Sequence, residues 1–341
     1  MTTFADVTTL RVGGPARRWV ATDSEAELVE AVRAADDRSE PLLVLGGGSN
    51  VVVADEGFDG TVVQVGHRGI ERDSDSCGGV LVTFAAGEPW DEAVGWALAE
   101  GLSGIESLSG IPGLTGATPI QNVGAYGQEV GDTLARIRAY DRHEQRVRTL
   151  AVGDLGLGYR TSSLKTAPNR FVVLDVTLQL ITERLGAPIR YAELARTLDV
   201  EVGQRAPATD VRSAVLQLRR SKGMVLDAAD ADTRSVGSFF TNPVLDAARA
   251  DELPAAAPKY PAGDGRAKTS AAWLIEQAGF APGYGGGDAR LSSKHTLAIT
   301  NHSGTATAAD VVALAREIRE GVLARFGVEL VPEPTLIGIT L

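Results

Sequence analysis

The sequence predicts a protein of several domains, of mixed α/β and α+β class. Its 341 residues are enough for two or three domains of ordinary size. Helix-like and strand-like segments alternate along the chain, and two of the predicted strands lead towards glycine-rich segments. Glycine contributes 39 residues, about 11% against a typical ~7%, without the period of collagen. This excess indicates tight loops.

The composition excludes several classes of protein. Hydrophobic residues make up 44% and charged residues 23%, which excludes a mainly disordered chain. The formal net charge is −11, and no long run of Lys or Arg is present, so we expect neither nucleic acid nor a membrane surface as a partner. No apolar stretch approaches the ~18 residues of a membrane span. The N-terminal residues lack a signal-peptide pattern, and the single cysteine, Cys77, cannot form an intramolecular disulfide. We therefore expect a cytoplasmic protein.

The first 65 residues predict a compact α/β unit. A capping-box pattern at 24–27 begins a helix whose apolar face carries Leu28, Val32 and Ala35. Strands are expected at 41–45, 51–53 and 61–65.

The next predicted elements lead into an unusual segment. A strand is expected at 80–86, followed by a helix that starts at Pro89 and stops at Gly101. Segment 109–127 then has five glycines and two prolines in nineteen residues and almost no charge. It cannot form a long helix or a central strand, and it does not have the composition of a solvated linker. We expect its backbone to pack closely against a neighbour such as a ligand. Further strands are expected at 134–140, 146–150 and 171–181.

The C-terminal part has a different pattern. A helix over about 209–221 places Val211, Val215 and Leu218 on one face. Segment 245–265 is rich in Ala, Pro and Gly and is predicted to be loop. Helices are expected at 269–278 and 308–326, with a strand at 297–301 between them. The inward face of the last helix carries Val311, Leu314, Ile318 and Val322.

The turn Gly46–Asn50 would let backbone N–H groups approach a phosphate. It is not a P-loop, because the Gly-Lys-Ser/Thr ending is missing, and it does not match G-x-G-x-x-G. Taken alone, a tight turn between strands explains it as well as a diphosphate site does. Two glycine-rich segments flanked by strands, however, suit a dinucleotide cofactor with a pyrophosphate and an extended ring system.

These two segments closely resemble those of the UDP-N-acetylenolpyruvoylglucosamine reductase (MurB) family. They read Leu45-Gly-Gly-Gly-Ser-Asn50 and Gly110-Ile-Pro-Gly-Leu-Thr-Gly-Ala-Thr-Pro-Ile-Gln-Asn-Val-Gly-Ala-Tyr-Gly127. The resemblance continues at 158–165, 237–243 and 330–338, so five blocks in the family's order span nearly the whole chain. Segment 182–210 is present, which resembles the branch of the family with a tyrosine loop.

The resemblance implies an FAD-binding fold of the PCMH (vanillyl-alcohol-oxidase-like) type. Two α/β subdomains are expected at 1–66 and 67–217, the PCMH-type region covering about 12–182. A substrate-binding α+β domain is expected at 218–328, and a terminal strand at 329–341 is expected to pack back near the FAD. The implied activity is the reduction, by NADPH, of enolpyruvyl-UDP-N-acetylglucosamine to UDP-N-acetylmuramate for peptidoglycan. The expected partners are therefore small molecules, and the expected state is a monomer.

The resemblance also implies site residues. Arg160, Ser238 and Glu333 fall on the family's three catalytic positions. An arginine fork suits a carboxylate and the negative charge of an enolate, whereas a serine hydroxyl can deliver a proton and a glutamate can orient or polarise the reacting group. The residues expected to hold FAD are Leu45, Gly46, Gly47, Gly48, Ser49, Asn50, Gly110, Gly113, Gly116, Ala117, Pro119, Gln121, Asn122, Gly124, Ala125, Tyr126 and Gly127. Those expected to contact the substrate are Tyr159, Lys165, Tyr191, Lys222, Asn242 and Lys268.

Each of these residues also has a purely structural interpretation. In isolation, Arg160 would be a surface ion-pair partner, Ser238 a polar strand position and Glu333 a loop carboxylate. Tyr191 could begin a helix, and Lys222 could be a solvated helix end. 

Two further residues are weaker candidates. Lys268 and His295 could contact an anionic substrate, but His295 has no ligand cluster at metal spacing, so no metal is expected. Cys77, beside two glycines, is interpreted as a loop thiol.

Four positions depart from the family's pattern: Thr161, Leu164, Thr241 and Pro334. None removes a catalytic residue type. Pro334 follows Glu333 where an aliphatic residue is usual, and it could alter the path of the last strand.

Two other functions remain open. An FAD-linked alcohol oxidase of the same superfamily is disfavoured because no conspicuous His or Cys for covalent flavin attachment lies near the glycine-rich segments. A nucleotide-sugar-binding protein without turnover is disfavoured because Arg160, Ser238 and Glu333 are retained together.

Overall fold

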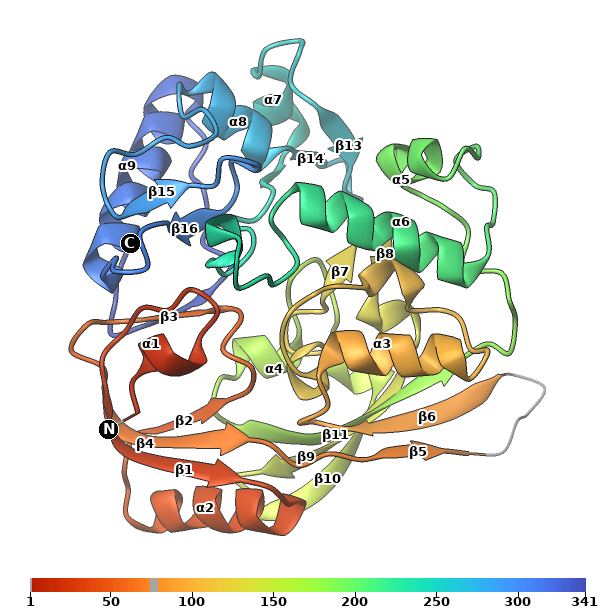
Figure 1. Ribbon diagram of the computed structural model, residues 1–341, viewed down its shortest axis with the longest axis vertical. Coiled ribbons are helices and arrows are strands. Elements are labelled where there is room, and N and C mark those ends of the chain that lie inside the picture. Colours follow the sequence, from red (N-terminus) through yellow and green to blue (C-terminus); the bar gives the residue numbers. More distant parts are fainter. Residues whose placement is uncertain (1, 74–78) are drawn as a thin grey trace. The chain divides into compact units, whose positions relative to one another are not determined.

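The computed structural model describes residues 2–73 and 79–341, and its chain forms two compact units (Figure 1). The larger unit comprises Ala16–Gly47 and Asp59–Ser221. The smaller unit comprises Met1–Pro15, Gly48–Phe58 and Lys222–Leu341. The chain therefore leaves the larger unit inside the glycine-rich turn, after Gly47, and again at the end of α6. Residues 1–15 and 48–58, expected in the first FAD-binding subdomain at 1–66, are part of the smaller unit, and the boundary at 66/67 stays a prediction.

The larger unit contains two main sheets. A three-stranded sheet has the order β1 (Ala16–Thr22), β4 (Phe58–Val65), β2 (Leu42–Leu45), with β2 parallel to β4. A five-stranded antiparallel sheet has the order β10 (Arg146–Ala151), β9 (Leu134–Asp141), β11 (Phe171–Leu180), β6 (Val80–Ala85), β5 (Ile70–Arg72). The expected strands are confirmed. The sequence analysis missed β1 and β5, whose charged and exposed positions hide the apolar pattern of a strand.

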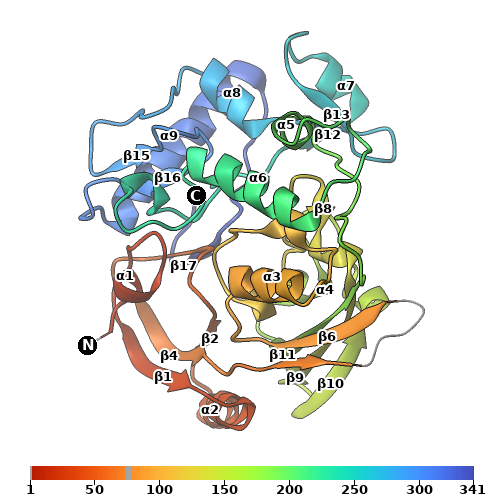
Figure 2. The same cartoon turned by 45° about the vertical axis from the view of Figure 1, so that its right-hand side comes forward.

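Three helices of the larger unit were expected from the sequence: α2 (Glu25–Asp37), α3 (Trp90–Ala99) and α6 (Ala208–Ser221). The short helices α4 (Ser163–Thr166) and α5 (Ala192–Thr197) were not. The Ser24 side chain accepts a hydrogen bond from the Glu27 amide and begins α2, which lies along the three-stranded sheet in both Figure 1 and Figure 2. Pro89 precedes α3, and Gly101 follows it with φ +73°.

Segment 109–127 forms no long element, as predicted. It contains the single 3₁₀ turn Thr115–Ala117 and the two-residue strand β7 (Gly124–Ala125), which pairs with β8 (Gln128–Glu129). Its residues are nevertheless mostly buried or half-buried, as expected for backbone packed against neighbouring groups.

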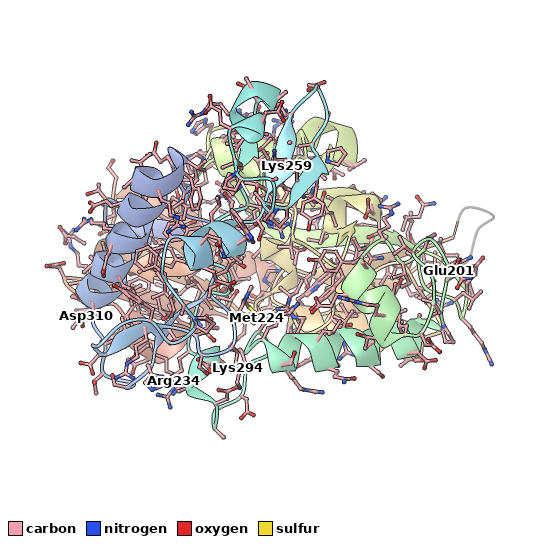
Figure 3. All side chains as sticks on the ribbon, turned by 90° about the horizontal axis from the view of Figure 1, so that it is seen from above. Glu201, Met224, Arg234, Lys259, Lys294 and Asp310 are labelled. Carbon is pink, nitrogen blue, oxygen red and sulfur yellow. The ribbon has the colours of Figure 1, made fainter. Side chains whose placement is uncertain are left out.

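The smaller unit packs short elements around one long helix. Its helices are α1 (Phe4–Val7), α7 (Ala247–Asp251), α8 (Ala271–Gln277) and α9 (Ala308–Phe326). The sheets are β12 (Val244–Leu245)–β14 (Ala267–Thr269)–β13 (Lys259–Pro261), β15 (Ala289–Leu291)–β16 (Ile299–Asn301), and β17 (Thr335–Ile337) parallel to β3 (Val51–Val53). Val311, Leu314, Ile318 and Val322 of α9 are buried, as expected. Asp310, labelled in Figure 3, lies in the first turn of α9, where its carboxylate accepts the Thr307 amide.

Two expectations for this unit were wrong in part. Segment 245–265 is not all loop, because it contains α7 and β13, and Lys259 of β13 is labelled in Figure 3. The terminal strand spans only Thr335–Ile337 rather than 329–341. Elements of two to five residues depend on distant partners, here β14 and β3, so local periodicity cannot reveal them.

Within residues 2–73 and 79–341, no helix is both long enough and apolar enough to cross a membrane. Cys77 lies outside the described residues, so the prediction of a loop thiol there stays a prediction.

Candidate active site

The two glycine-rich segments touch within the larger unit. A Cβ added to Gly47 would lie 2.9 Å from the Gly113 Cα, and one added to Gly46 would lie 3.8 Å from the Leu114 side chain. Gly113 itself has φ +118°, a conformation that side chains rarely adopt. The sequence predicted that these segments act together, and the structure brings their backbones closer than any residue with a side chain would allow.

The 110–127 segment is fixed to the end of β6 and the start of α3. The amide of Thr115 donates to the Glu88 carbonyl at 2.8 Å, and the amide of Gly116 donates to the Ala86 carbonyl at 2.9 Å. A Cβ on Gly116 would lie 2.5 Å from the Ala86 Cβ, so only glycine fits there. These bonds fix the backbone of the segment against the end of β6 and the start of α3.

Asp91 anchors the first glycine of this segment, and sequence analysis missed it. Its Oδ1 accepts hydrogen bonds from the Gly110 amide and from Arg212 Nη1, both at 2.6 Å, while Oδ2 accepts from Arg212 Nη2 at 2.9 Å. Burial by itself would raise the pKa of Asp91, but the hydrogen bonds from Arg212 and Gly110 lower it below its usual value. The available signal was an acidic residue in the first turn of a helix, which is common and unspecific.

Arg160 lies on a tight turn that precedes α4. Its backbone is left-handed, with φ +55°, and the Lys165 Nζ donates to its carbonyl at 3.1 Å. The guanidinium Nη2 donates to the Gly124 carbonyl at 2.7 Å, and the guanidinium carbon lies 5.3 Å from the centre of the Tyr159 ring. The structure therefore brings together four predicted site residues from two separate sequence blocks.

Asn122, predicted to hold FAD, is buried and bonded to protein groups. Its Nδ2 donates to Glu129 Oε2 at 2.8 Å and to the Gly158 carbonyl at 3.2 Å, and its Oδ1 accepts from the Gly131 amide at 2.9 Å. These bonds connect the glycine-rich segment to the turn that carries Arg160.

Tyr126 connects the glycine-rich segment to α5 and α6. Its ring packs edge-on against Tyr191 with centres 5.5 Å apart, and Tyr191 is 48% exposed at the position that precedes α5. Burial raises the pKa of Tyr126 to about 12, against the opposing effect of the Arg219 charge. Burial also lowers the pKa of Arg219 to about 10, so this residue is still a cation at neutral pH. Sequence analysis gave Arg219 no role.

Ser238 and Glu333 lie on neighbouring chain segments of the smaller unit, and both are half-buried. The Phe239 amide donates to the Leu297 carbonyl at 2.7 Å, and the Glu333 amide donates to the Phe239 carbonyl at 2.9 Å. Segment 235–241 is thus held on both sides by backbone hydrogen bonds. Phe239, the residue after Ser238, is therefore hydrogen-bonded to Leu297 on one side and to Glu333 on the other.

Pro334 lies between two residues whose amides are hydrogen-bonded, Glu333 and Thr335. The Glu333 amide pairs with Phe239, whereas the Thr335 amide donates to the Asn50 carbonyl at 3.0 Å. The chain therefore changes its pairing partner at Pro334, where no amide donor is needed. The proline at 334, which departs from the family's pattern, thus stands where the backbone pairing needs no N–H donor.

The other predicted site residues of the smaller unit lie on different elements. Lys222 directly follows α6, and Lys268 lies in β14 between β12 and β13. The Asn242 Oδ1 accepts the Ala271 amide at 2.9 Å, so this side chain helps to begin α8. A Cβ on Gly48 would lie 2.5 Å from the Val7 carbonyl oxygen, which explains the glycine at this position of the turn.

Comparisons with known proteins agree with this geometry. Residues 16–149 match the family model described as an FAD binding domain, and residues 229–337 match the model of the C-terminal domain of UDP-N-acetylenolpyruvoylglucosamine reductase. The chain is 55% identical over 348 residues to the UDP-N-acetylenolpyruvoylglucosamine reductase of Thermobifida fusca (strain YX), covering 99% of this chain and 97% of that protein. It is 54% identical over 350 residues to that of Saccharopolyspora erythraea, covering 99% and 95%.

A solved structure has the same fold. The UDP-N-acetylenolpyruvylglucosamine reductase (MurB) from Thermus caldophilus matches with a TM-score of 0.67 and 26% identity, over 98% of this chain and 97% of that one. The fold and the glycine-lined segments define the class, an FAD-dependent oxidoreductase, and the backbone contact of Gly47 with Gly113 fits a dinucleotide cradle. The chain belongs to the UDP-N-acetylenolpyruvoylglucosamine reductase (MurB) family. The resemblance and the fold class predicted from the sequence are confirmed, whereas the tyrosine-loop branch stays a prediction.

Proposed function

We propose that this protein reduces enolpyruvyl-UDP-N-acetylglucosamine to UDP-N-acetylmuramate with NADPH, as a cytoplasmic monomer that serves peptidoglycan synthesis. The observation that supports this proposal most directly is the setting of Arg160. Its left-handed backbone and its bond to the Gly124 carbonyl place a cation beside the glycine-rich segment of the FAD-binding unit. Residues held in such rare conformations cluster at functional sites.

The residues that would hold FAD are those of the two glycine-rich segments, with Gly47 and Gly113 in backbone contact. FAD, when bound, supplies hydride transfer from NADPH to the enolpyruvyl double bond. The Asp91 bond to the Gly110 amide fixes where the second segment begins.

Arg160 would hold the substrate carboxylate. Hydride addition to the terminal enolpyruvyl carbon builds negative charge on the carbon that carries this carboxylate, as an enolate. A guanidinium is always charged and presents its N–H groups in a planar fork, so it binds the carboxylate with two prongs and stabilises the charge as it develops.

Ser238 would donate the proton that completes the reaction. Its hydroxyl transfers a proton to the enolate carbon, and Glu333, on the adjacent segment, would orient or polarise the same group. Lys222, Lys268 and the tyrosine Tyr191 would contact the UDP diphosphate and sugar, since an acidic protein needs local donors for such an anion.

Stopped-flow absorbance tests the role of Ser238 by separating two half-reactions on one sample. Ser238→Ala should still bleach the flavin band with NADPH at close to the native rate, because that step needs no proton from Ser238. Reoxidation by the enolpyruvyl substrate should slow by about 10²–10⁴-fold. Ser238→Cys should recover part of this rate, and Ser303→Ala, at an exposed serine of the same unit, should behave as the native protein. Equal slowing of both halves, or of neither, would contradict the proposed proton donor.

A further inference from the structure

We propose that Asn122 and Gly124 serve the reaction by positioning Arg160, through a structure that we call the Arg160 seat (Asn122, Gly124 and Glu129). Sequence analysis assigned Asn122 and Gly124 to the FAD contact. The inference rests on the proposed function of Arg160 and adds the residues that give its guanidinium one orientation.

Gly124 contributes to the seat in two ways: its carbonyl accepts a hydrogen bond from Arg160, and its lack of a side chain leaves room for the guanidinium. Its carbonyl accepts the Arg160 Nη2 hydrogen bond at 2.7 Å. A Cβ added to Gly124 would lie 3.0 Å from Arg160 Nη1 and 2.8 Å from Glu129 Cγ. Real Cβ contacts are rarely so short, so any side chain at 124 would press on the guanidinium. Gly124 has no positive φ in this structure, and the requirement for glycine is therefore one of space.

Asn122 joins the seat to the turn that carries Arg160. Its amide nitrogen donates both to the Gly158 carbonyl, two residues before Arg160, and to Glu129 Oε2. Its amide oxygen accepts the Gly131 amide. All of these partners are protein groups, so the 3% exposed side chain fixes one segment against another.

The backbone shows that this geometry is costly and therefore specified. Asn122, Tyr126 and Arg160 have φ of +46°, +50° and +55°. A left-handed backbone is strained for a residue with a side chain, and the surrounding bonds must offset this strain. The hydrogen bond from Lys165 Nζ to the Arg160 carbonyl is one of the bonds that stabilise the turn.

Orientation matters because a carboxylate is bound by two parallel N–H groups. A fork that is rotated or displaced by about 1 Å loses the second prong and can cost roughly 10²-fold in rate. The Gly124 carbonyl binds Nη2 of the guanidinium. The Arg160 seat therefore determines which edge of the guanidinium faces an incoming carboxylate.

Gly124→Ala in the full-length, FAD-loaded protein tests the proposal. We expect FAD to be retained and reduced by NADPH, because the other residues of the two glycine-rich segments would still hold it. The KM for the enolpyruvyl substrate should rise, and flavin reoxidation should slow by roughly 10²-fold. Two matched glycines provide the controls. Gly153→Ala, with nothing near its Cβ, should be native, whereas Gly116→Ala, which would strike Ala86, should lose FAD instead.

The Arg160→Ala background separates this inference from the proposed function. If Gly124 acts through Arg160, then Gly124→Ala should cost little more once Arg160 is absent. A severe Arg160→Ala defect with a fully additive Gly124→Ala defect, or FAD loss in Gly124→Ala, would overturn the seat and leave the function of Arg160 intact. Native activity of Arg160→Ala would overturn both.

A second pair of variants keeps the test valid if Gly124→Ala does not fold. Asn122→Asp removes the donors to Gly158 and to Glu129 and places two carboxylates together, so reoxidation should slow while FAD is retained. Adding Glu129→Gln restores one donor between the pair and should recover part of the rate. Unchanged reoxidation in Asn122→Asp, or a slowed rate that Glu129→Gln does not recover, would contradict the seat.

Discussion

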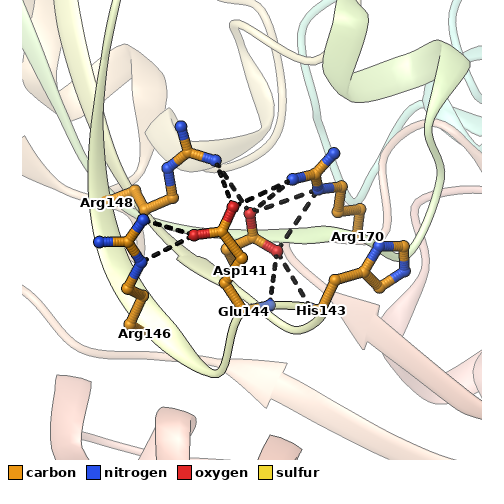
Figure 4. Close-up of polar contacts among 6 residues, drawn as sticks. All are labelled: Asp141, His143, Glu144, Arg146, Arg148 and Arg170. Atoms are coloured by element: carbon orange, nitrogen blue, oxygen red, sulfur yellow. Dashed lines mark hydrogen bonds and ion pairs between the residues drawn. The ribbon is translucent and has the colours of Figure 1, made fainter.

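The larger unit holds its arginines in two different ways. At the end of β9, the buried carboxylate of Asp141 accepts hydrogen bonds from Arg170 Nη2 at 2.9 Å and from Arg148 Nη1 at 3.2 Å (Figure 4). Glu144 pairs with Arg146 in the same cluster. Arg160, by contrast, bonds to the Gly124 carbonyl from a left-handed backbone.

The difference is consistent with a structural role for the Asp141 cluster and with the catalytic role that we propose for Arg160. The Asp141 cluster brings opposite formal charges together from the β9–β10 hairpin and from Arg170, which precedes β11, so its charges satisfy each other. One of the groups that hold Arg160 is the neutral Gly124 carbonyl, and the planar fork of its guanidinium suits an external carboxylate. Four predictions can break or sharpen this comparison.

Arg160→Lys should give the largest effect. Lysine keeps the charge but loses the planar fork, so kcat/KM should fall by roughly 10²-fold or more. The midpoint of denaturant unfolding should change little, because the residue is half-buried on a turn. Steady-state assays with varied substrate measure the first quantity, and near-native kcat/KM would show that Arg160 is structural.

Asp141→Asn should act on stability instead. The change leaves Arg148 and Arg170 without their buried carboxylate, so the free energy of unfolding should fall by about 2–4 kcal/mol. Activity per folded molecule should be unchanged. Denaturant titration measures the loss, and a selective loss of kcat/KM would erase the distinction between the two sites.

The same carboxyl group should make stability depend on pH. Burial alone would raise the pKa of Asp141, but hydrogen bonds from Arg170, the Glu144 amide and Arg148 hold it far below its usual range. A carboxyl with a depressed folded pKa stabilises the protein above its unfolded pKa of about 4, and this stability is lost as pH falls towards the folded value. Unfolding measured from pH 6 to pH 2.5 should therefore lose less stability in Asp141→Asn than in the native protein. Parallel curves would contradict this.

Arg146→Gln should give the smallest effect. Its side chain is 66% exposed and pairs with Glu144 at the rim of the cluster. Exposed pairs contribute about 0–1 kcal/mol, so both unfolding and activity should stay near native values. A stability loss as large as that of Asp141→Asn would mean that the cluster acts as one cooperative network.

The sequence predicted long periodic elements well and the seat of Arg160 poorly. The four apolar positions of α9 and the glycine-rich 109–127 segment carry their signals locally. The motif pointed to Arg160, but only the fold shows that Gly124 lies against its guanidinium, because the contact joins residues 36 apart. Asp91 and Arg212, 121 residues apart, were missed for the same reason.

The central claim is that Arg160 binds the substrate carboxylate. Two ligands that differ in that group test it most directly. Affinity for enolpyruvyl-UDP-N-acetylglucosamine and for UDP-N-acetylglucosamine would be measured by calorimetry on the native protein, Arg160→Ala and Arg170→Lys. A two-pronged charged contact should give the native protein a preference of roughly 10–100-fold for the enolpyruvyl ligand. Arg170→Lys should keep this preference and Arg160→Ala should lose it. A preference that survives in Arg160→Ala would show that another residue binds the carboxylate.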